Sequence, residues 1–140
     1  MNPSTHPQRT DWPGTIQTRV ARPSRNLDDT VRFYRDGVGF TVIASWQDHD
    51  GYNGTVLAIG DASRQLELLE VAGVDPAPTS EDQLVLYLGS SAGVRSAVDR
   101  IRAAGYEPSI SPNPYWAREG AECFSDPDGY WLILSPSTWA

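Results

Sequence analysis

The chain contains no lysine: all eleven of its basic residues are arginine. Schiff-base catalysis, attachment of pyridoxal phosphate and the phosphate-binding lysine of P-loop proteins are therefore excluded. Cysteine is nearly absent as well, since Cys123 is the only one among 140 residues. One cysteine cannot form a disulfide within the chain, so we expect a cytoplasmic protein.

Long apolar runs and an excess of positive charge are also missing. No apolar run approaches the roughly 20 residues needed to cross a bilayer, so we expect no membrane partner. Residues 1–14 are polar and lack the apolar stretch of a secretory signal. The formal net charge is −7, and an acidic chain repels phosphate backbones, so we expect no nucleic-acid partner.

The first half of the chain has the pattern of one helix and four strands. Asn26 is a favourable N-cap for a helix that should end at Gly37 and Gly39. Alternating or apolar runs predict strands over residues 16–22, 40–46, 52–59 and 64–70. The predicted order is β-α-β-β-β.

The second half repeats this order after a linker at residues 71–82. A helix around Val94 to Ile101 should be capped by Gly105, and residues 111–118 are expected to form a loop. Strands are predicted over residues 83–88, 107–110, 119–124 and 130–135. The halves are offset by about 67 residues. We therefore predict an α+β fold of two βαβββ modules.

Two segments carry a resemblance to a known superfamily. Residues 25–40 read RNLDDTVRFYRDGVGF, and residues 124–134 read FSDPDGYWLIL. They are similar to the opening helix and the closing hairpin of the vicinal-oxygen-chelate superfamily, which includes glyoxalase I, bleomycin-resistance and fosfomycin-resistance proteins, and extradiol dioxygenases. The resemblance spans residues 16–135 and implies U-shaped mixed sheets around a small-molecule pocket. It also implies a homodimer, but no particular activity.

The predicted elements and the extent of the resemblance indicate the domain organisation. We expect a flexible arm at residues 1–14 and a single domain at residues 15–140, with module one at 15–72 and module two at 82–136. The expected partners are a small-molecule ligand and a second copy of the chain.

The resemblance also implies where a metal would be bound. Metal-binding members place one ligand, usually His or Glu, on each of four strands, and the matching positions here are Arg19, Glu67, Gln83 and Ile133. Only Glu67 is a good ligand, because arginine stays protonated, glutamine binds weakly and isoleucine does not bind. We therefore expect no metal and no other cofactor. The match at Gln83 is the least direct, because module two has extra loop residues.

Arg19 and Glu67 should face one another, since the resemblance places the first and fourth strands of a module side by side. An arginine fork can hold a carboxylate, and its charge would stand where a metal supplies charge in other members. The pair is either structural, or Arg19 also binds an anionic or carbonyl oxygen of a ligand. His49, in an acidic turn, is either an acid/base group or a solvated turn residue.

Several further residues are candidates for contact with a ligand. Alternation along the strands directs one set toward the pocket, and the loop at residues 111–118 is either a lid over the pocket or a dimer contact. Ordinary core packing is the alternative for each aromatic residue. The candidate ligand contacts are Gln83, Tyr87, Asn113, Tyr115, Trp116, Trp131 and Ile133.

Three functions remain open. The first is a metal-independent enzyme of the isomerase, cyclase or lyase type that uses Glu67, Arg19 and His49. The second is a ligand-sequestering protein of the bleomycin-resistance type. The third is a metal-dependent enzyme of the glyoxalase or dioxygenase type.

Overall fold

The computed structural model describes residues 12–14 and 16–139. Module one forms a four-stranded sheet in the order β1-β4-β3-β2, in which β1 runs parallel to β4 and the other neighbours are antiparallel. Its elements are β1 (Thr18–Pro23), α1 (Leu27–Arg32), the π-helical turn η1 (Phe33–Val38), β2 (Thr41–His49), β3 (Tyr52–Ile59) and β4 (Asp61–Val71).

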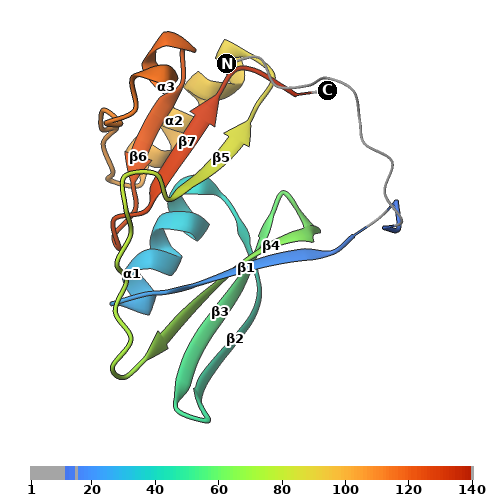
Figure 1. The fold of residues 1–140 in the computed structure, drawn as a ribbon, viewed down its shortest axis with the longest axis vertical. Coiled ribbons are helices and arrows are strands. Elements are labelled where there is room, and N and C mark those ends of the chain that lie inside the picture. Colours follow the sequence, from blue (N-terminus) through green and yellow to red (C-terminus); the bar gives the residue numbers. More distant parts are fainter. Residues whose placement is uncertain (1–11, 15, 140) are drawn as a thin grey trace.

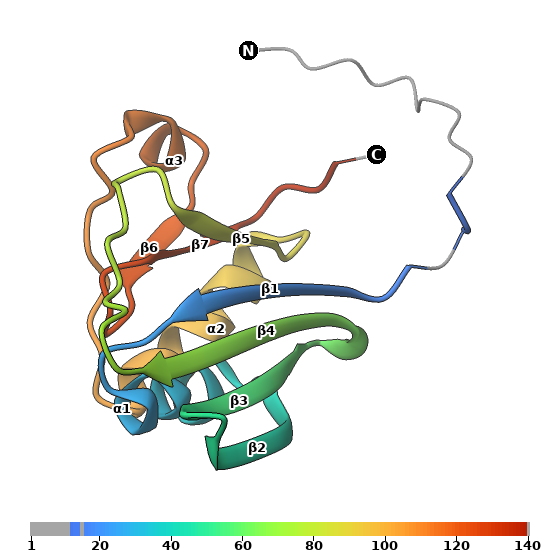
Figure 2. The ribbon, with the colours of Figure 1, turned by 60° about the horizontal axis from the view of Figure 1, so that its bottom comes forward.

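Module two forms a three-stranded sheet in the order β5-β7-β6, with β5 parallel to β7. Its elements are β5 (Gln83–Tyr87), α2 (Ser91–Ala103), α3 (Pro114–Arg118), β6 (Glu122–Ser125) and β7 (Trp131–Ser135). The two sheets form separate layers (Figures 1 and 2). β1 is an edge strand of the first sheet and β5 is an edge strand of the second, and these two edges face each other. The predicted α+β fold of two βαβββ modules is confirmed.

The first helix follows from local sequence at both ends. The Asn26 side chain accepts a hydrogen bond from the Asp29 amide, as an N-cap should. Gly39 ends the helical segment in the left-handed conformation, with φ of 89°. The prediction that Gly37 also ends it was wrong, because Gly37 lies inside the π-helical turn and is buried against Tyr106.

Module two departs from the sequence prediction in two places. The strand expected over residues 107–110 is reduced to a single bridge between Ser109 and Cys123. The segment expected to be a loop contains α3, because the Asn113 side chain caps the Tyr115 amide and Pro114 occupies the first helical turn.

One hydrophobic core joins the inner faces of both sheets. It contains Leu66 and Leu68 from β4 and Leu132 and Leu134 from β7, together with the buried faces of the helices. A smaller cluster around Ile133 lies separately on the outer face of the second sheet. The residues that alternate with the core leucines, including Glu67 and Ile133, therefore lie on outer faces.

The two sequence motifs are in direct contact. The Tyr34 hydroxyl from the opening helix donates a 2.6 Å hydrogen bond to Asp126 in the closing hairpin. Thr30 donates one of 2.8 Å to Asp128. Burial raises the pKa of both Asp126 and Tyr34. The motif residues thus hold the helix of module one against the last hairpin of module two.

The remaining predictions concern the N-terminal arm and membrane-spanning helices. Most of the predicted arm at residues 1–14 lies outside the described residues, so the domain boundaries stay predictions. Among the helices of the described residues, none has the length and apolar character needed to cross a membrane.

Candidate functional site

Arg19 and Glu67 meet on the outer face of the first sheet. Arg19 pairs with Gln65 in the register of β1 and β4, and Glu67 follows two residues later on the same face. Arg19 Nη1 lies 3.7 Å from Glu67 Oε2, with the two side chains 49% and 15% exposed. The expected ion pair therefore forms, but it is loose and open to water on the arginine side.

The guanidinium of Arg19 has donors to spare. Its Nε donates a 2.9 Å hydrogen bond to Gln65 Oε1. Arg19 Nε therefore binds Gln65 and not Glu67, so Arg19 and Glu67 do not form a bidentate pair. Gln65 is in turn fixed by donating to the Ala62 carbonyl. Because a guanidinium has five N–H donors, most of those of Arg19 have no partner among the described residues and are available to a ligand oxygen.

Trp46 belongs to the same face, although the sequence patterns did not single it out. It pairs with Gly54 in the register of β2 and β3, and its indole lies over the space that a side chain on Gly54 would fill. Gly54 faces Leu69, two residues beyond Glu67 on β4. A glycine opposite a tryptophan on neighbouring strands was the signal in the sequence.

His49 is not brought to this pair. It ends β2 with a side chain that is 78% exposed, and its Nε2 lies 3.8 Å from Asp50. Its partner on β3 is Tyr52, whereas Glu67 faces Val56, four residues farther along. The separation along the strand is roughly 13 Å, so His49 has no direct contact with Glu67.

The other candidates lie in module two, where α3 covers the outer face of the second sheet. Trp116 is buried over Cys123 and the fully buried Ile133, and Trp131 and Tyr115 pack around them. The indole Nε1 of Trp116 is buried and has no hydrogen-bond partner among the described residues. This segment forms a wall that is closed over Ile133.

Three polar candidates surround that wall. Asn113 Nδ2 and Gln83 Nε2 both approach the same oxygen, Glu81 Oε1, at 3.3 Å and 3.5 Å. Burial and the nearby carboxylate of Glu119 raise the pKa of Tyr115. Tyr87 ends β5, is 41% exposed and packs edge-on against Trp139. The structure thus groups Asn113 and Gln83 but leaves Tyr87 at the other end of its strand.

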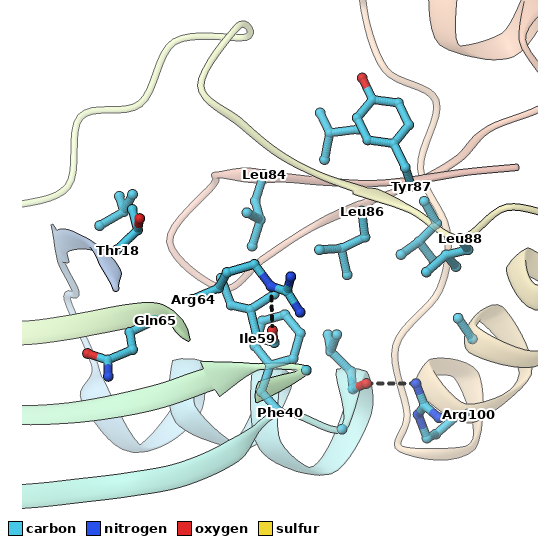
Figure 3. Close-up of a pocket in the computed structure, with 17 residues that line it drawn as sticks. Thr18, Phe40, Ile59, Arg64, Gln65, Leu84, Leu86, Tyr87, Leu88 and Arg100 are labelled. Atoms are coloured by element: carbon cyan, nitrogen blue, oxygen red, sulfur yellow. Dashed lines mark hydrogen bonds between the residues drawn. The ribbon is translucent and has the colours of Figure 1, made fainter. Parts of the chain in front are cut away.

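A cavity of about 710 Å³ lies between the modules, next to both β1 and β5. Figure 3 shows Leu84 and Leu86 directed toward Ile59 and Phe40, with Arg64 between them. Leu84 and Leu86 are partly buried against the core that includes both helices, whereas Leu88 is 37% exposed. Neither Arg19 nor Glu67 is among the described residues that line this cavity.

The donors at the four family positions do not suit a divalent ion. Arg19 and Glu67 are on one sheet, and Gln83 and Ile133 are on the other. The described part of the chain contains no group of three or more His, Cys, Asp or Glu side chains that could hold a metal. A site with one carboxylate beside a guanidinium lacks the three or four donors that such an ion requires.

Comparison with known sequences assigns the family. Residues 18–69 match the YycE-like N-terminal domain, and residues 81–135 match the YycE-like C-terminal domain. The YycE protein of Bacillus subtilis is 31% identical over 123 residues, which cover 86% of this chain and 88% of the relative. The chain belongs to the YycE-like family. The two matches coincide with the two modules of the structure.

Solved structures place the YycE-like fold within the vicinal-oxygen-chelate superfamily. The crystal structure of Bacillus subtilis YycE has a TM-score of 0.82 at 28% identity, covering 94% of this chain and 96% of that one. The fosfomycin-resistance protein FosX of Listeria monocytogenes, solved with Mn(II) and a dihydroxypropylphosphonic acid, has a TM-score of 0.69 at 18% identity, over 91% and 95%. The trypanothione-dependent glyoxalase I of Leishmania major scores 0.63 at 22% identity, over 85% and 84%. The last two likenesses show the fold alone.

Proposed function

We propose that this YycE-like protein is a metal-independent enzyme that acts on a small organic metabolite at Arg19 and Glu67. The observation that carries the proposal is the half-exposed ion pair at two of the positions where the superfamily holds its metal. FosX and glyoxalase I are enzymes or resistance proteins by name, but their fold alone does not transfer their reactions.

Arg19 would supply the positive charge that the reaction needs. Most of its N–H donors have no partner in residues 12–14 and 16–139, and a carbonyl or carboxylate oxygen could accept from them. Donors fixed in place stabilise the negative charge that develops on such an oxygen in a transition state. Gln65 positions the guanidinium through its hydrogen bond to Arg19 Nε.

Glu67 would move the proton. Its side chain is 15% exposed and lies beside the guanidinium, so it can accept a proton from a carbon next to the bound carbonyl. The electron pair of the broken C–H bond then forms an enolate whose oxygen is held by Arg19. If the substrate is an α-hydroxy carbonyl compound, Glu67 returns the proton to the former carbonyl carbon while the hydroxyl proton passes to the oxygen held by Arg19, and the product is an isomer. If the β-carbon carries a leaving group, that group departs with its bonding electrons and takes the proton from Glu67, which leaves a C=C bond, as in a lyase reaction.

We further propose that the enzyme works as a homodimer. The Arg19–Glu67 face and the Gln83–Ile133 face belong to the outer surfaces of two different sheets. A second copy laid on the outer face of the first sheet would enclose Arg19 and exclude water. Asn113 and Tyr115 keep the role of candidate ligand contacts, and His49 keeps that of a candidate acid/base group. The cytoplasmic location stays a prediction from the single cysteine.

The experiment is a screen of small carbonyl and carboxylate metabolites that records both binding and product formation by NMR. The protein is kept in a buffer that contains a metal chelator. We expect turnover by the wild type, and binding without turnover by Glu67→Gln. Arg19→Gln should lose binding. Surface variant Arg118→Gln, on α3, is the matched control and should behave as the wild type.

Two results would point to the alternatives. Binding with no product by either the wild type or Glu67→Gln would indicate a sequestering protein of the bleomycin-resistance type. Turnover that appears only when a divalent ion replaces the chelator would indicate a metal-dependent enzyme. A chain that sediments as a monomer at all concentrations would contradict the homodimer.

A further inference from the structure

A second site lies between the modules, apart from the Arg19–Glu67 pair. It is a cleft bounded by β1 and β5, which belong to different sheets and are not hydrogen-bonded to each other. Its volume of about 710 Å³ falls in the range of clefts that hold organic ligands, roughly 300–1,000 Å³. Gln65 lines the cleft and also accepts a hydrogen bond from Arg19.

The walls of the cleft are mainly apolar and incompletely covered. Leu84 and Leu86 project into it from β5, toward Ile59 at the end of β3 (Figure 3). On the opposite side, Val20 of β1 is 55% exposed. Leu88, which directly follows β5, is 37% exposed. Because apolar side chains in contact with water are unfavourable, these walls favour an occupant with an apolar body.

The charged groups of the cleft have one sign. Arg64 and Arg100 line it, and none of the described lining residues is acidic. This contrasts with the chain as a whole, whose formal net charge is −7. A positive cleft in an acidic protein attracts anions and repels cations.

Both guanidinium groups are held against glycine backbone. Arg100 lies over Gly39 and donates to the carbonyls of Gly37 and Val38, at 3.3 Å and 2.7 Å. Arg64 lies over Gly60 and donates to the Ile59 carbonyl at 3.1 Å.

Within the part of the chain that the structure describes, these contacts leave N–H donors without a partner on both arginines, because each guanidinium carries five. Asp61 Oδ2 accepts from Arg64 Nη2 at 3.4 Å, so the charge of Arg64 is partly compensated by a carboxylate that does not line the cleft. Arg100 forms no salt bridge in the described part of the chain, so its charge is available to a ligand.

We propose that the cleft between β1 and β5 binds a small amphipathic organic anion. The apolar body of this ligand lies among Val20, Leu84 and Leu86, and its acidic group lies against the guanidinium groups of Arg64 and Arg100. The site does not depend on the function proposed for Arg19 and Glu67, since those residues do not line it.

The test is isothermal titration calorimetry of the full chain with octanoate, and with 1-octanol as the neutral probe of equal length. The wild type is expected to bind octanoate at one site per chain and at least tenfold more tightly than 1-octanol. The double variant Arg64→Gln/Arg100→Gln should lose this preference while its affinity for 1-octanol is unchanged. Arg95→Gln, on the same helix as Arg100 but outside the cleft, should keep it.

A further variant tests the apolar wall of the cleft, and a single variant replaces the double variant in case that one misfolds. Ala97→Leu adds bulk to the cleft from α2 without changing either charge, and should abolish binding of both probes. If the double variant does not fold, Arg64→Gln alone gives the same comparison with a smaller loss, because its side chain is at the surface.

Four results would overturn the proposal. They are the absence of octanoate binding, equal affinity of the wild type for the two probes, an equal loss in Arg95→Gln, and undiminished binding in Ala97→Leu. A second copy of the chain in the cleft would also overturn it. In that case octanoate binding would weaken as the protein concentration rises and the dimer observed by sedimentation increases.

Discussion

The hydroxyl of Tyr34 donates a 2.6 Å hydrogen bond to Asp126, which lies 92 residues farther along the chain. Both side chains are buried, and Asp126 also accepts from the amides of Asp128 and Tyr130. Arg22 Nη1 lies 3.7 Å away and supplies the compensating charge. The contact joins the two motifs by which the superfamily is recognised, so those motifs mark a structural junction rather than a reaction.

Removing the donor of that junction should destabilise the fold. Tyr34→Phe leaves one oxygen of a buried carboxylate without its closest hydrogen bond, and a loss of about 1–3 kcal/mol in the free energy of unfolding is expected. Urea denaturation followed by circular dichroism measures it. Tyr52→Phe is the matched control, because Tyr52 is 42% exposed, and it should change stability by less than about 0.5 kcal/mol. Equal losses in the two variants would contradict a stabilising role of the Tyr34–Asp126 hydrogen bond.

The same carboxyl should give stability a distinct dependence on pH. Burial raises the pKa of Asp126 above its usual value of 3.8, although its contacts with Tyr34 and Arg22 act in the opposite direction. A raised pKa means that the folded state takes up the proton more readily than the unfolded state. The contribution of this group is therefore fully present below pH 3.8 and is lost as the pH rises through the raised pKa.

The measurement compares the wild type with Asp126→Asn, which does not titrate, by urea denaturation at a series of acid pH values. The difference in the free energy of unfolding should move in favour of the wild type as the pH falls toward 3.8. Other carboxyl groups titrate alike in both proteins and cancel. A difference that moves in favour of Asp126→Asn on acidification would show that the contacts of Asp126 outweigh its burial.

The Arg19–Glu67 pair should contribute little to stability. Arg19 is 49% exposed, and a pair so accessible to water is worth about 0–1 kcal/mol. Glu67→Gln should therefore lower the free energy of unfolding by no more than about 1 kcal/mol, in the same chemical denaturation experiment. A loss of about 3 kcal/mol or more would indicate a structural ion pair instead.

Gly54 and Trp46 should behave as a coupled pair. A Cβ on Gly54 would overlap the indole of Trp46, so Gly54→Ala must displace that ring. In the background of Trp46→Ala the same substitution should be close to neutral. A double-mutant cycle by thermal or urea denaturation gives the coupling, for which about 0.5–3 kcal/mol is expected between contacting residues. Additive effects would mean that the indole moves aside without cost.

Trp116 should matter for its volume and not for its N–H group. It fills the space above Ile133, so Trp116→Ala should cost about 3–5 kcal/mol of stability. Its Nε1 has no partner among the described residues, so Trp116→Phe removes no hydrogen bond and should cost much less. Denaturation curves of the two variants decide this. Similar losses would indicate that the indole N–H has an acceptor.

Much of the fold could be predicted from the sequence because its signals are local. Asn26 caps its own helix, Gly39 and Gly105 adopt the positive φ expected of them, and the alternation along β4 separates Leu66 and Leu68 from Glu67. The pairing of Arg19 with Glu67 was predicted from the family resemblance, which implies that the first and fourth strands of a module are neighbours, as β1 and β4 are.

The rest depends on contacts between distant segments. Gly37 remains helical because it is buried against Tyr106, and α3 forms where prolines and aromatic residues suggested a loop. The relative placement of the two outer faces, and hence the distance of Ile133 from Glu67, cannot be derived from alternation within each sheet. The cleft with Arg64 and Arg100 was missed for the same reason.

The central claim is that the guanidinium of Arg19 stands in place of a metal at this site. It is tested most directly by the divalent metal content per chain of protein purified without chelator, measured by mass spectrometry for the wild type and for Glu67→Gln. Far less than one ion per chain is expected in both proteins. One ion per chain in the wild type, lost in Glu67→Gln, would contradict it.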